Sequence, residues 1–325
     1  MKILIIGGTG MTGRHIVREL AGLGHEVTVF HRGRHALALP LGVGEVLGDK
    51  GDLWSRRQEI GRLTLDLVLH MSTVTKADAY EFTRTFGGMV GRAVAISSGD
   101  VYRAYGRLRG TEPGPPEPLP LTEDSPLRES LGPEGEAYDK TGVEAILRSQ
   151  TDLSCTLIRY PAVFGPHDGQ RRFHEYFQRI RDNREAILIG DSAVGFRFTH
   201  AYSENAAHAV VLAATSDMAT GRTYNVGELE TPRELERLQQ IVAALSWRGR
   251  IVVVPDNELP EHLQRPAIDQ RQNLVMDDAR IREELGYSEV VDAGEGIRRS
   301  YEWAASQVMD TTRDYAEEDA VLARY

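Results

Sequence analysis

Three glycines near the N-terminus have the spacing of a phosphate-binding turn. Gly7, Gly10 and Gly13 follow an apolar run, Lys2–Ile6, and precede a helical pattern, Met11–Leu23. Gly7 permits a sharp turn, Gly10 lets the backbone approach a pyrophosphate, and Gly13 allows close packing of helix on strand. The phosphates then bind the N–H groups at the positive end of the helix dipole. The segment predicts a dinucleotide site, with a ligand-free glycine turn as the alternative.

The end of the second predicted strand, Glu26–Phe30, carries basic residues. Many NAD sites have an acid here that binds the adenosine 2′-hydroxyl, but this chain continues with His31 and Arg32. Arg32 and Arg34 could pair with a 2′-phosphate, and Asp49 is placed to meet the adenine edge. The pattern favours NADP(H) over NAD(H). The alternative is that both arginines are solvated loop charges.

Strand-length apolar runs alternate with helical segments through the first half of the chain. Nearly continuous apolar runs are typical of parallel strands that are buried on both faces. The strand candidates are Lys2–Ile6, Glu26–Phe30, Asp66–His70, Ala93–Ser98 and Ser154–Arg159, and the helix candidates are Met11–Leu23, Ala77–Gly88 and Ala137–Ser149. This alternation predicts an α/β fold with a doubly wound, parallel, Rossmann-type sheet and a smaller, mixed α/β substrate domain at the C-terminal end.

The expected domain boundaries follow from changes in pattern. Residues 1–165 should form the dinucleotide domain, with a contribution from about 196–226. Residues 166–195 and 227–305 should form the substrate domain, and residues 306–325 an acidic tail that is either mobile or a short packed helix. Further elements are expected at Glu204–Thr215, Arg222–Val226, Pro232–Leu245, Arg250–Val254 and Asp277–Leu285.

A proline-rich segment interrupts this order. Six of the 14 prolines fall between Gly110 and Pro126, which excludes a helix or a central strand there. We expect a long surface loop, and both a lid and an inert connection stay open.

Composition limits the classes of partner. The net charge of −10 disfavours nucleic acids and anionic lipid surfaces, and no run approaches the length of a membrane span. The single cysteine, Cys155, fits a reducing compartment. The histidines show no metal-like spacing with other ligands, so no metal is expected. These features predict a soluble, cytoplasmic protein with a small-molecule substrate, and a homodimer stays open.

Several motifs later in the chain extend the glycine pattern. They are His70-Met71-Ser72-Thr73, Ile96-Ser97-Ser98-Gly99-Asp100-Val101-Tyr102, Arg159-Tyr160-Pro161-Ala162-Val163-Phe164-Gly165-Pro166, Arg197-Phe198-Thr199-His200, Tyr224-Asn225-Val226-Gly227 and Arg282-Glu283-Glu284-Leu285-Gly286-Tyr287. In this order and spacing, over about residues 1–305, the chain resembles the extended short-chain dehydrogenase/reductase family, in its NAD-dependent epimerase/dehydratase group. The resemblance implies a Rossmann fold and a bound nicotinamide dinucleotide.

The resemblance also implies catalytic roles. Ser98 would hydrogen-bond the reacting oxygen, and Tyr138 would give or take the proton. The family has a lysine four residues after this tyrosine, where this chain has Gly142. Lys140 is no simple substitute, because two residues along a helix are about 200° apart. Either catalysis has lapsed, or the proton travels through water or Asp100, which could also be only a turn-capping residue.

Binding residues are implied in the same way. The cofactor contacts would be Gly7, Thr9, Gly10, Met11, Gly13, His31, Arg32, Arg34, Asp49, Met71, Ser72, Ser97, Tyr138, Tyr160, Pro161 and Val163. Substrate contacts would come from Ser98, Tyr102 and Arg197, although Arg197 could instead form a salt bridge. The sugar-nucleotide branch usually has asparagine where this chain has Ala162, which disfavours a diphosphate sugar.

Three functions follow as hypotheses. The first is an NADP(H)-dependent oxidoreductase that moves hydride between nicotinamide and a small carbonyl or alcohol. The second is a nucleotide-sugar epimerase or dehydratase that retains NAD(P). The third is a non-catalytic dinucleotide sensor or scaffold, which the missing lysine makes plausible.

Overall fold

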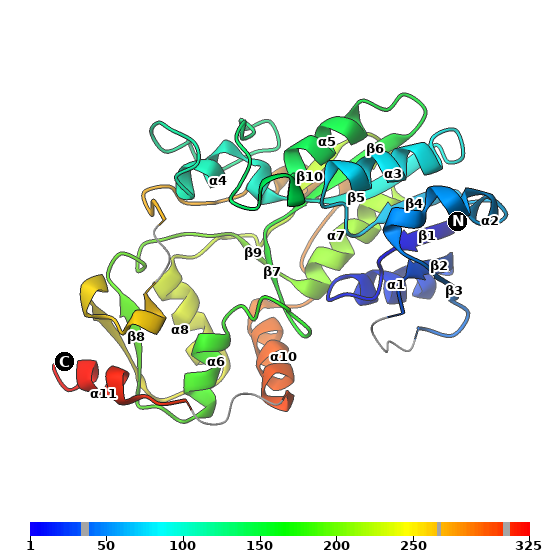
Figure 1. Cartoon of the computed structure of the whole chain (residues 1–325). Coiled ribbons are helices and arrows are strands. Elements are labelled where there is room, and N and C mark those ends of the chain that lie inside the picture. Colours follow the sequence, from blue (N-terminus) through cyan, green and yellow to red (C-terminus); the bar gives the residue numbers. More distant parts are fainter. Residues whose placement is uncertain (34–38, 265–267, 308–312) are drawn as a thin grey trace.

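A parallel sheet of seven strands forms the larger part of the molecule (Figure 1). The computed structural model describes residues 1–33, 39–264, 268–307 and 313–325. In spatial order the strands are β10 (Thr223–Asn225), β6 (Ser154–Tyr160), β5 (Arg92–Ser98), β4 (Leu67–His70), β1 (Lys2–Ile6), β2 (Glu26–His31) and β3 (Gly44–Leu47). This order confirms the predicted doubly wound sheet, because the chain first moves outward from β1 to β3 and then crosses to β4 on its other side.

Helices cover both faces of this sheet because its strands are apolar on both sides. Alternate β1 residues enter different cores, with Ile5 in one and Leu4 in the other. The helices α1 (Gly13–Gly22) and α7 (Ser203–Thr215) cover the first face. On the second face lie α3 (Lys76–Phe86) and α5 (Lys140–Arg148), whose apolar sides complete the other core. The short helix α2 (Arg57–Gly61) adds Ile60 to this core, whereas α4 (Arg103–Leu108) packs in a separate cluster with Leu121, Phe196, Leu274 and Met276.

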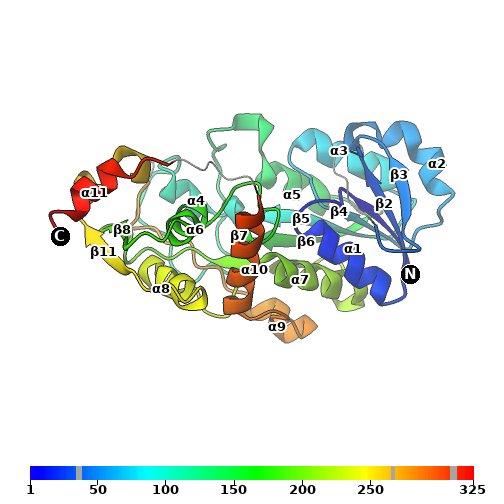
Figure 2. The ribbon, with the colours of Figure 1, turned by 90° about the horizontal axis from the view of Figure 1, so that it is seen from below.

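A smaller part lies beside the sheet and contains the C-terminus, at the opposite end of the molecule from the N-terminus (Figure 2). Its two-stranded sheet pairs β8 (Ala186–Gly190) with β11 (Arg250–Val254). Two further strands, β7 (Ala162–Phe164) and β9 (His200–Tyr202), pair with each other. The helices of this part include α6 (His174–Arg181), α8 (Glu234–Ala244) and α10 (Ala293–Ser306). The sequence patterns had indicated α8 and β11, but not α6, β8 or α10.

The described end of the acidic tail is a short packed helix, α11 (Ala316–Leu322). Glu318 on this helix is buried and accepts two hydrogen bonds from the buried guanidinium of Arg179 on α6, at 2.6 and 2.9 Å. Val321 and Leu322 pack beside β8 and β11. Of the two alternatives for the tail, the packed helix is therefore the one observed.

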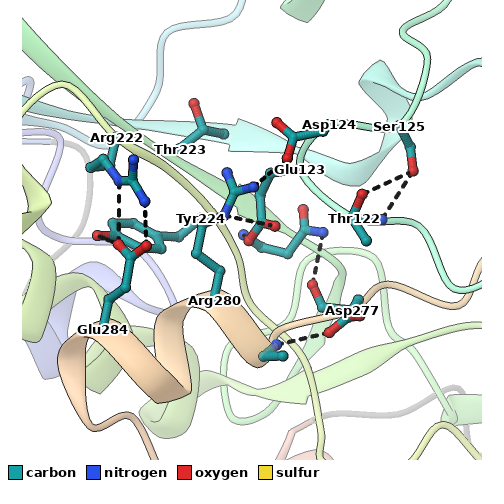
Figure 3. Close-up of polar contacts among 12 residues, drawn as sticks. Thr122, Glu123, Asp124, Ser125, Arg222, Thr223, Tyr224, Asp277, Arg280 and Glu284 are labelled. Carbon is teal, nitrogen blue, oxygen red and sulfur yellow. Dashed lines mark hydrogen bonds and ion pairs between the residues drawn. The ribbon is translucent and has the colours of Figure 1, made fainter.

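The proline-rich loop is fixed at its far end to the sheet (Figure 3). The carboxylate of Glu123 accepts a hydrogen bond of 2.8 Å from the backbone N–H of Asn225, at the end of β10. Arg280 on α9 (Ala279–Leu285) pairs with both Glu123 and Asp124. The same helix is bound to β10 through Glu284, which accepts a hydrogen bond of 2.7 Å from the hydroxyl of Tyr224. These contacts hold the neighbouring Leu121 at the cavity described below.

Candidate active site

The glycine turn has the geometry of a phosphate cradle. Gly7 adopts a φ of 95°, in the left-handed region that favours glycine. A Cβ at Gly13 would lie within 2.8 Å of the backbone of Gly8, so only glycine fits this contact between turn and helix. A Cβ at Gly10 would meet nothing within 4 Å, so this backbone faces open space. These three positions fit the pyrophosphate of a dinucleotide at the start of α1.

The cavity beside this turn is lined by six of the predicted cofactor contacts, Gly7, Thr9, Gly10, His31, Arg32 and Ser72. Its other lining residues are Ile6, Phe30, Gly48 and Lys50. The Arg32 side chain is 52% exposed, and its ion-pair contact with Asp49 is long, at 3.9 Å. Arg32 is therefore available to a ligand. Arg34 lies outside the described residues.

The other residues around this cavity are more constrained. Nε2 of His31 lies 2.8 Å from a carboxylate oxygen of Glu45, so this ring nitrogen already has a hydrogen-bond partner. The Asp49 carboxylate accepts a hydrogen bond from the backbone N–H of Gly51 and caps the turn that follows β3. Lys50 was missed by the sequence analysis, and its ammonium donates to the carbonyl of Ser72 and to Asp78 at 2.8 and 2.7 Å.

Four of the remaining predicted cofactor contacts are not among the residues that line this cavity, although Met71 lies beside Gly7 of the turn. Met11 and Met71 pack against the core on the side of α1. Val163 is a buried core residue. The Ser97 hydroxyl donates 2.6 Å to buried Glu144, which leaves it no free donor for a cofactor. The expectation for Ser97 therefore does not fit its position.

A second, smaller cavity lies at the carboxyl end of β5. Its volume is about 200 Å³, and its walls include Tyr160, Pro161, Leu121, Phe198, Leu274 and Met276. Ser98, Asp100 and Tyr138 contribute to its lining, together with the polar side chains of Tyr105, Gln170, Arg172 and Thr199. Ser98 ends β5, Asp100 lies in the turn that follows, and Tyr138 precedes α5. The structure thus brings together the three residues expected to be catalytic.

Hydrogen bonds join these three side chains. The Tyr138 hydroxyl donates to the Asp100 carboxylate and also shares a hydrogen bond with Ser98. Burial and the neighbouring Asp100 charge raise the pKa of Tyr138 well above its ordinary value. Tyr138 therefore remains a protonated phenol at neutral pH.

Lys140 also faces this region, contrary to the expectation from helical geometry. Helix α5 begins only at Lys140, so the predicted helix start at Ala137 is wrong. Tyr138 and Asp139 have non-helical backbone angles, with φ values of −144° and −125° and ψ values of 88° and 76°, so the 100° step per residue of a helix does not relate Tyr138 to Lys140. The Asp139 side chain caps the helix through the backbone N–H of Gly142. This capping aspartate was the sequence signal for the later start.

The Lys140 ammonium is buried beneath the ends of β4 and β5. It donates hydrogen bonds to the carbonyl oxygens of Thr73 and, at 3.0 Å, Ile96. Burial lowers the pKa of Lys140 to about 8, while the Asp100 charge acts in the opposite direction. For Asp100 itself, burial raises the pKa and outweighs the Tyr138 hydrogen bond and the charges of Arg128 and Lys140, which lower it. A cation therefore stands next to the Ser98–Asp100–Tyr138 group.

We expect the charge of Lys140 to control activity on the alkaline side. Because its pKa is lowered to about 8, the cation is lost as pH rises through that value. The kcat/KM of the catalysed reaction should fall about tenfold over this step, which corresponds to loss of about 1.4 kcal/mol of stabilisation by the cation. Lys140→Met should remove the step in a pH profile, whereas Lys76→Met, at an exposed lysine, should keep it. Retention of the step in Lys140→Met would contradict this role.

Gly142 is constrained by space. A Cβ at this position would lie 2.3 Å from both the Asp139 carboxylate and Cε of Lys76. These two side chains form an ion pair of 3.2 Å next to the helix start. A lysine at position 142 would therefore disrupt the cap, and Gly142→Lys is not a route to the family's usual arrangement.

Even a methyl group at Gly142 should cost stability. Gly142→Ala should lower the free energy of unfolding by about 1–3 kcal/mol, because it overpacks the cap. The matched variant Gly22→Ala lies at a helical glycine with open space around it and should instead be neutral or stabilising. Urea unfolding monitored by circular dichroism measures both. Equal effects of the two variants would disprove the steric argument.

Two predicted substrate contacts lie outside the cavity. Tyr102 is fully buried, and its hydroxyl donates 2.6 Å to Asn225, so a substrate contact does not fit its position. Arg197 lines a separate open groove, and its Nε donates 2.9 Å to the carbonyl of Thr231. Conversely, the sequence analysis missed Gln170 and Arg172, which line the cavity from the loop after β7.

The comparisons with known proteins agree with this arrangement. Residues 3–227 match the model of the NAD dependent epimerase/dehydratase family. The chain belongs to this family. It is therefore an NAD(P)-dependent enzyme of the extended short-chain dehydrogenase/reductase type, an oxidoreductase or an epimerase.

Individual relatives include enzymes of both kinds. The chain is 26% identical to 2-alkyl-3-oxoalkanoate reductase of Stenotrophomonas maltophilia, over 75% of this chain and 76% of the relative. It is 27% identical to 2'-dehydrokanamycin reductase of Streptomyces kanamyceticus, over 81% and 72%. Among solved structures, UDP-glucose 4-epimerase of Thermotoga maritima shares the fold, with a TM-score of 0.72, 17% identity and coverage of 95% and 100%.

The described ranges contain no group of three or more His, Cys, Asp or Glu side chains that could hold a metal ion. None of the helices in these ranges has both the length and the apolar character that crossing a membrane requires.

Proposed function

We propose that this enzyme is an NADP(H)-dependent reductase of a small carbonyl compound, and that it also catalyses the reverse oxidation. The observation that carries the proposal is the cluster of Ser98, Tyr138 and Asp100 in a cavity of about 200 Å³. This volume is below the ~300–1,000 Å³ of sites for larger ligands. It suits a small ketone or aldehyde better than a nucleotide sugar.

The side chains divide the work of reduction. The nicotinamide, when bound, supplies the hydride. When the carbonyl compound binds, the Ser98 and Tyr138 hydroxyls turn their single O–H groups from their partners in the free site to the carbonyl oxygen, and there they stabilise the negative charge that develops on it. Tyr138 then gives its proton to this oxygen, and the nearby Lys140 ammonium stabilises the phenolate that is left.

Relatives and geometry together favour reduction over epimerisation. Two relatives are named as reductases, one of an oxoalkanoate and one of a dehydro-aminoglycoside. Ala162 lines the cavity where the sugar-nucleotide branch usually has asparagine, and Arg197 lies in a different groove. The grouping of Ser98 with Tyr138 also argues against a non-catalytic sensor.

The preference for NADP(H) rests on Arg32. This side chain lines the cofactor cavity, is half exposed and has only a long contact with Asp49. A charge-assisted contact with the 2′-phosphate should contribute about 1.5–3 kcal/mol. Arg32→Ala should therefore weaken NADP(H) binding about 10–100-fold and leave NAD(H) nearly unchanged, as measured by calorimetry. Arg18→Ala, at an exposed arginine on α1, is the matched control. Equal affinities of the unaltered enzyme for both cofactors would contradict the preference.

The reaction type is tested by incubating the enzyme with NADPH and small ketones or aldehydes. We expect NADP⁺ and alcohol to form in equal amounts. With UDP-glucose and NAD⁺ we expect neither a change in nicotinamide absorbance nor formation of the epimer. Epimer formation without net oxidation of cofactor would support the alternative.

A further inference from the structure

One oxygen of Asp100 has no partner. Its Oδ1 atom is buried and makes no hydrogen bond with any described residue, although Asp100 lines the catalytic cavity. The other carboxylate oxygen is the one left for the hydrogen bond that Tyr138 donates. A buried carboxylate oxygen without a donor is costly, so its presence at a cavity indicates a donor that arrives with a ligand.

The surroundings of Asp100 support a charged carboxylate rather than a neutral acid as the acceptor. Arg128 and Lys140 are only 5% and 6% exposed, and both lie close enough for their charges to act on Asp100. Neither donates a hydrogen bond to Oδ1. Two buried cations balance the carboxylate from within the protein and leave this oxygen for the cavity.

The lining of the cavity shows where a donor on the substrate finds its acceptor. Asp100 is the one carboxylate among the lining residues, and the amide oxygen of Gln170 already accepts a hydrogen bond of 2.6 Å from Arg172. Ser98 and Tyr138 serve the reacting oxygen. Because Tyr138 is hydrogen-bonded directly to Asp100, a group that reaches Oδ1 must lie on an atom close to the reacting carbon.

We propose that the substrate carries a hydroxyl or amino group next to its carbonyl, and that Asp100 selects it by accepting its hydrogen bond. This inference rests on the proposed reductase function and names its substrate class as small α-hydroxy or α-amino ketones with an otherwise apolar body. Asp100 is thereby a specificity-determining residue. A site that is built to receive a donor discriminates strongly against the analogue that lacks it.

The test uses two ketones of nearly equal shape, α-hydroxycyclohexanone and α-methylcyclohexanone. We expect kcat/KM with NADPH to be at least ~10-fold higher for the hydroxy ketone. In Asp100→Ala the ratio should fall to about one, and in Asp100→Asn, which keeps an acceptor oxygen without charge, it should lie between. Calorimetric NADP(H) affinity shows whether each variant is folded.

Binding measurements distinguish a failure of this inference from a failure of the proposed reductase function. The dissociation constants of both ketones for the complex with NADP⁺ can be measured by ligand-observed NMR without turnover. Preferential binding of the hydroxy ketone without any reduction would overturn the reductase function and support the role of Asp100. A ratio near one in the unaltered enzyme, an unchanged ratio in folded Asp100→Ala, or no binding of either ketone would overturn the inference.

Discussion

Tyr138→Phe is expected to lower kcat for carbonyl reduction by ~10²–10⁴-fold, the range for loss of a general acid. The phenol is held between Ser98 and Asp100 at the cavity, and its raised pKa keeps the proton in place at neutral pH. Phenylalanine keeps the ring but removes this proton. Dissociation constants for NADP(H) should change little, because the variant leaves the glycine turn intact.

The matched control is Tyr105→Phe. Tyr105 lines the same cavity and comes from α4. Its hydroxyl is not expected to donate the proton, so kcat should stay within a few-fold. Full activity of Tyr138→Phe would mean that the proton comes from Asp100, solvent or the substrate itself. The assignment of the cofactor site would be unaffected.

Gly10→Val is expected to weaken dinucleotide binding by at least ~100-fold while the protein stays folded. The position faces open space in the structure, so a side chain meets no protein atom there. It would instead stand where the pyrophosphate approaches the backbone. Calorimetry with NADPH measures the loss, and circular dichroism monitors the fold.

A valine elsewhere controls for the substitution itself. Gly91 also has open space around it and precedes β5. It therefore lies at the amino ends of the parallel strands, whereas the glycine turn lies at their carboxyl ends. Gly91→Val should bind NADPH normally. Normal binding by Gly10→Val as well would mean that the phosphate site has been misplaced.

Much of the fold could be predicted because its signals are local. Buried parallel strands such as β1 and β5 are short apolar runs, and the glycine turn after β1 marks the first crossover. The family motifs then add the order of the remaining strands. The elements that were missed, including β8 and α10, lie in the smaller part. Helix α10 carries several charged residues, and its buried face depends on contacts with segments far away in the chain.

The site could be predicted only in part, because its motifs are local but several of its contacts join segments that are far apart in the chain. Ser98 and Tyr138 follow from motif resemblance, and the structure brings them together. Lys140 was set aside because a continuous helix was assumed, whereas the Asp139 cap starts the helix after Tyr138. The positions of Tyr102 and Ser97 could not be foreseen. Their hydroxyls bind Asn225 and Glu144, which lie 123 and 47 residues away in sequence.

Transfer of deuterium from NADPH labelled at the nicotinamide C4 position tests whether hydride reaches a substrate carbonyl at this site. An α-hydroxy ketone is incubated with the enzyme and each stereospecifically labelled cofactor in turn, and the product alcohol is analysed by mass spectrometry. We predict deuterium on the new carbinol carbon from one of the two labels, in equal amount to the NADP⁺ formed, and its loss in Tyr138→Phe. Absence of deuterium from the product with both labels, while the enzyme binds NADPH, would contradict hydride transfer to a carbonyl at this site.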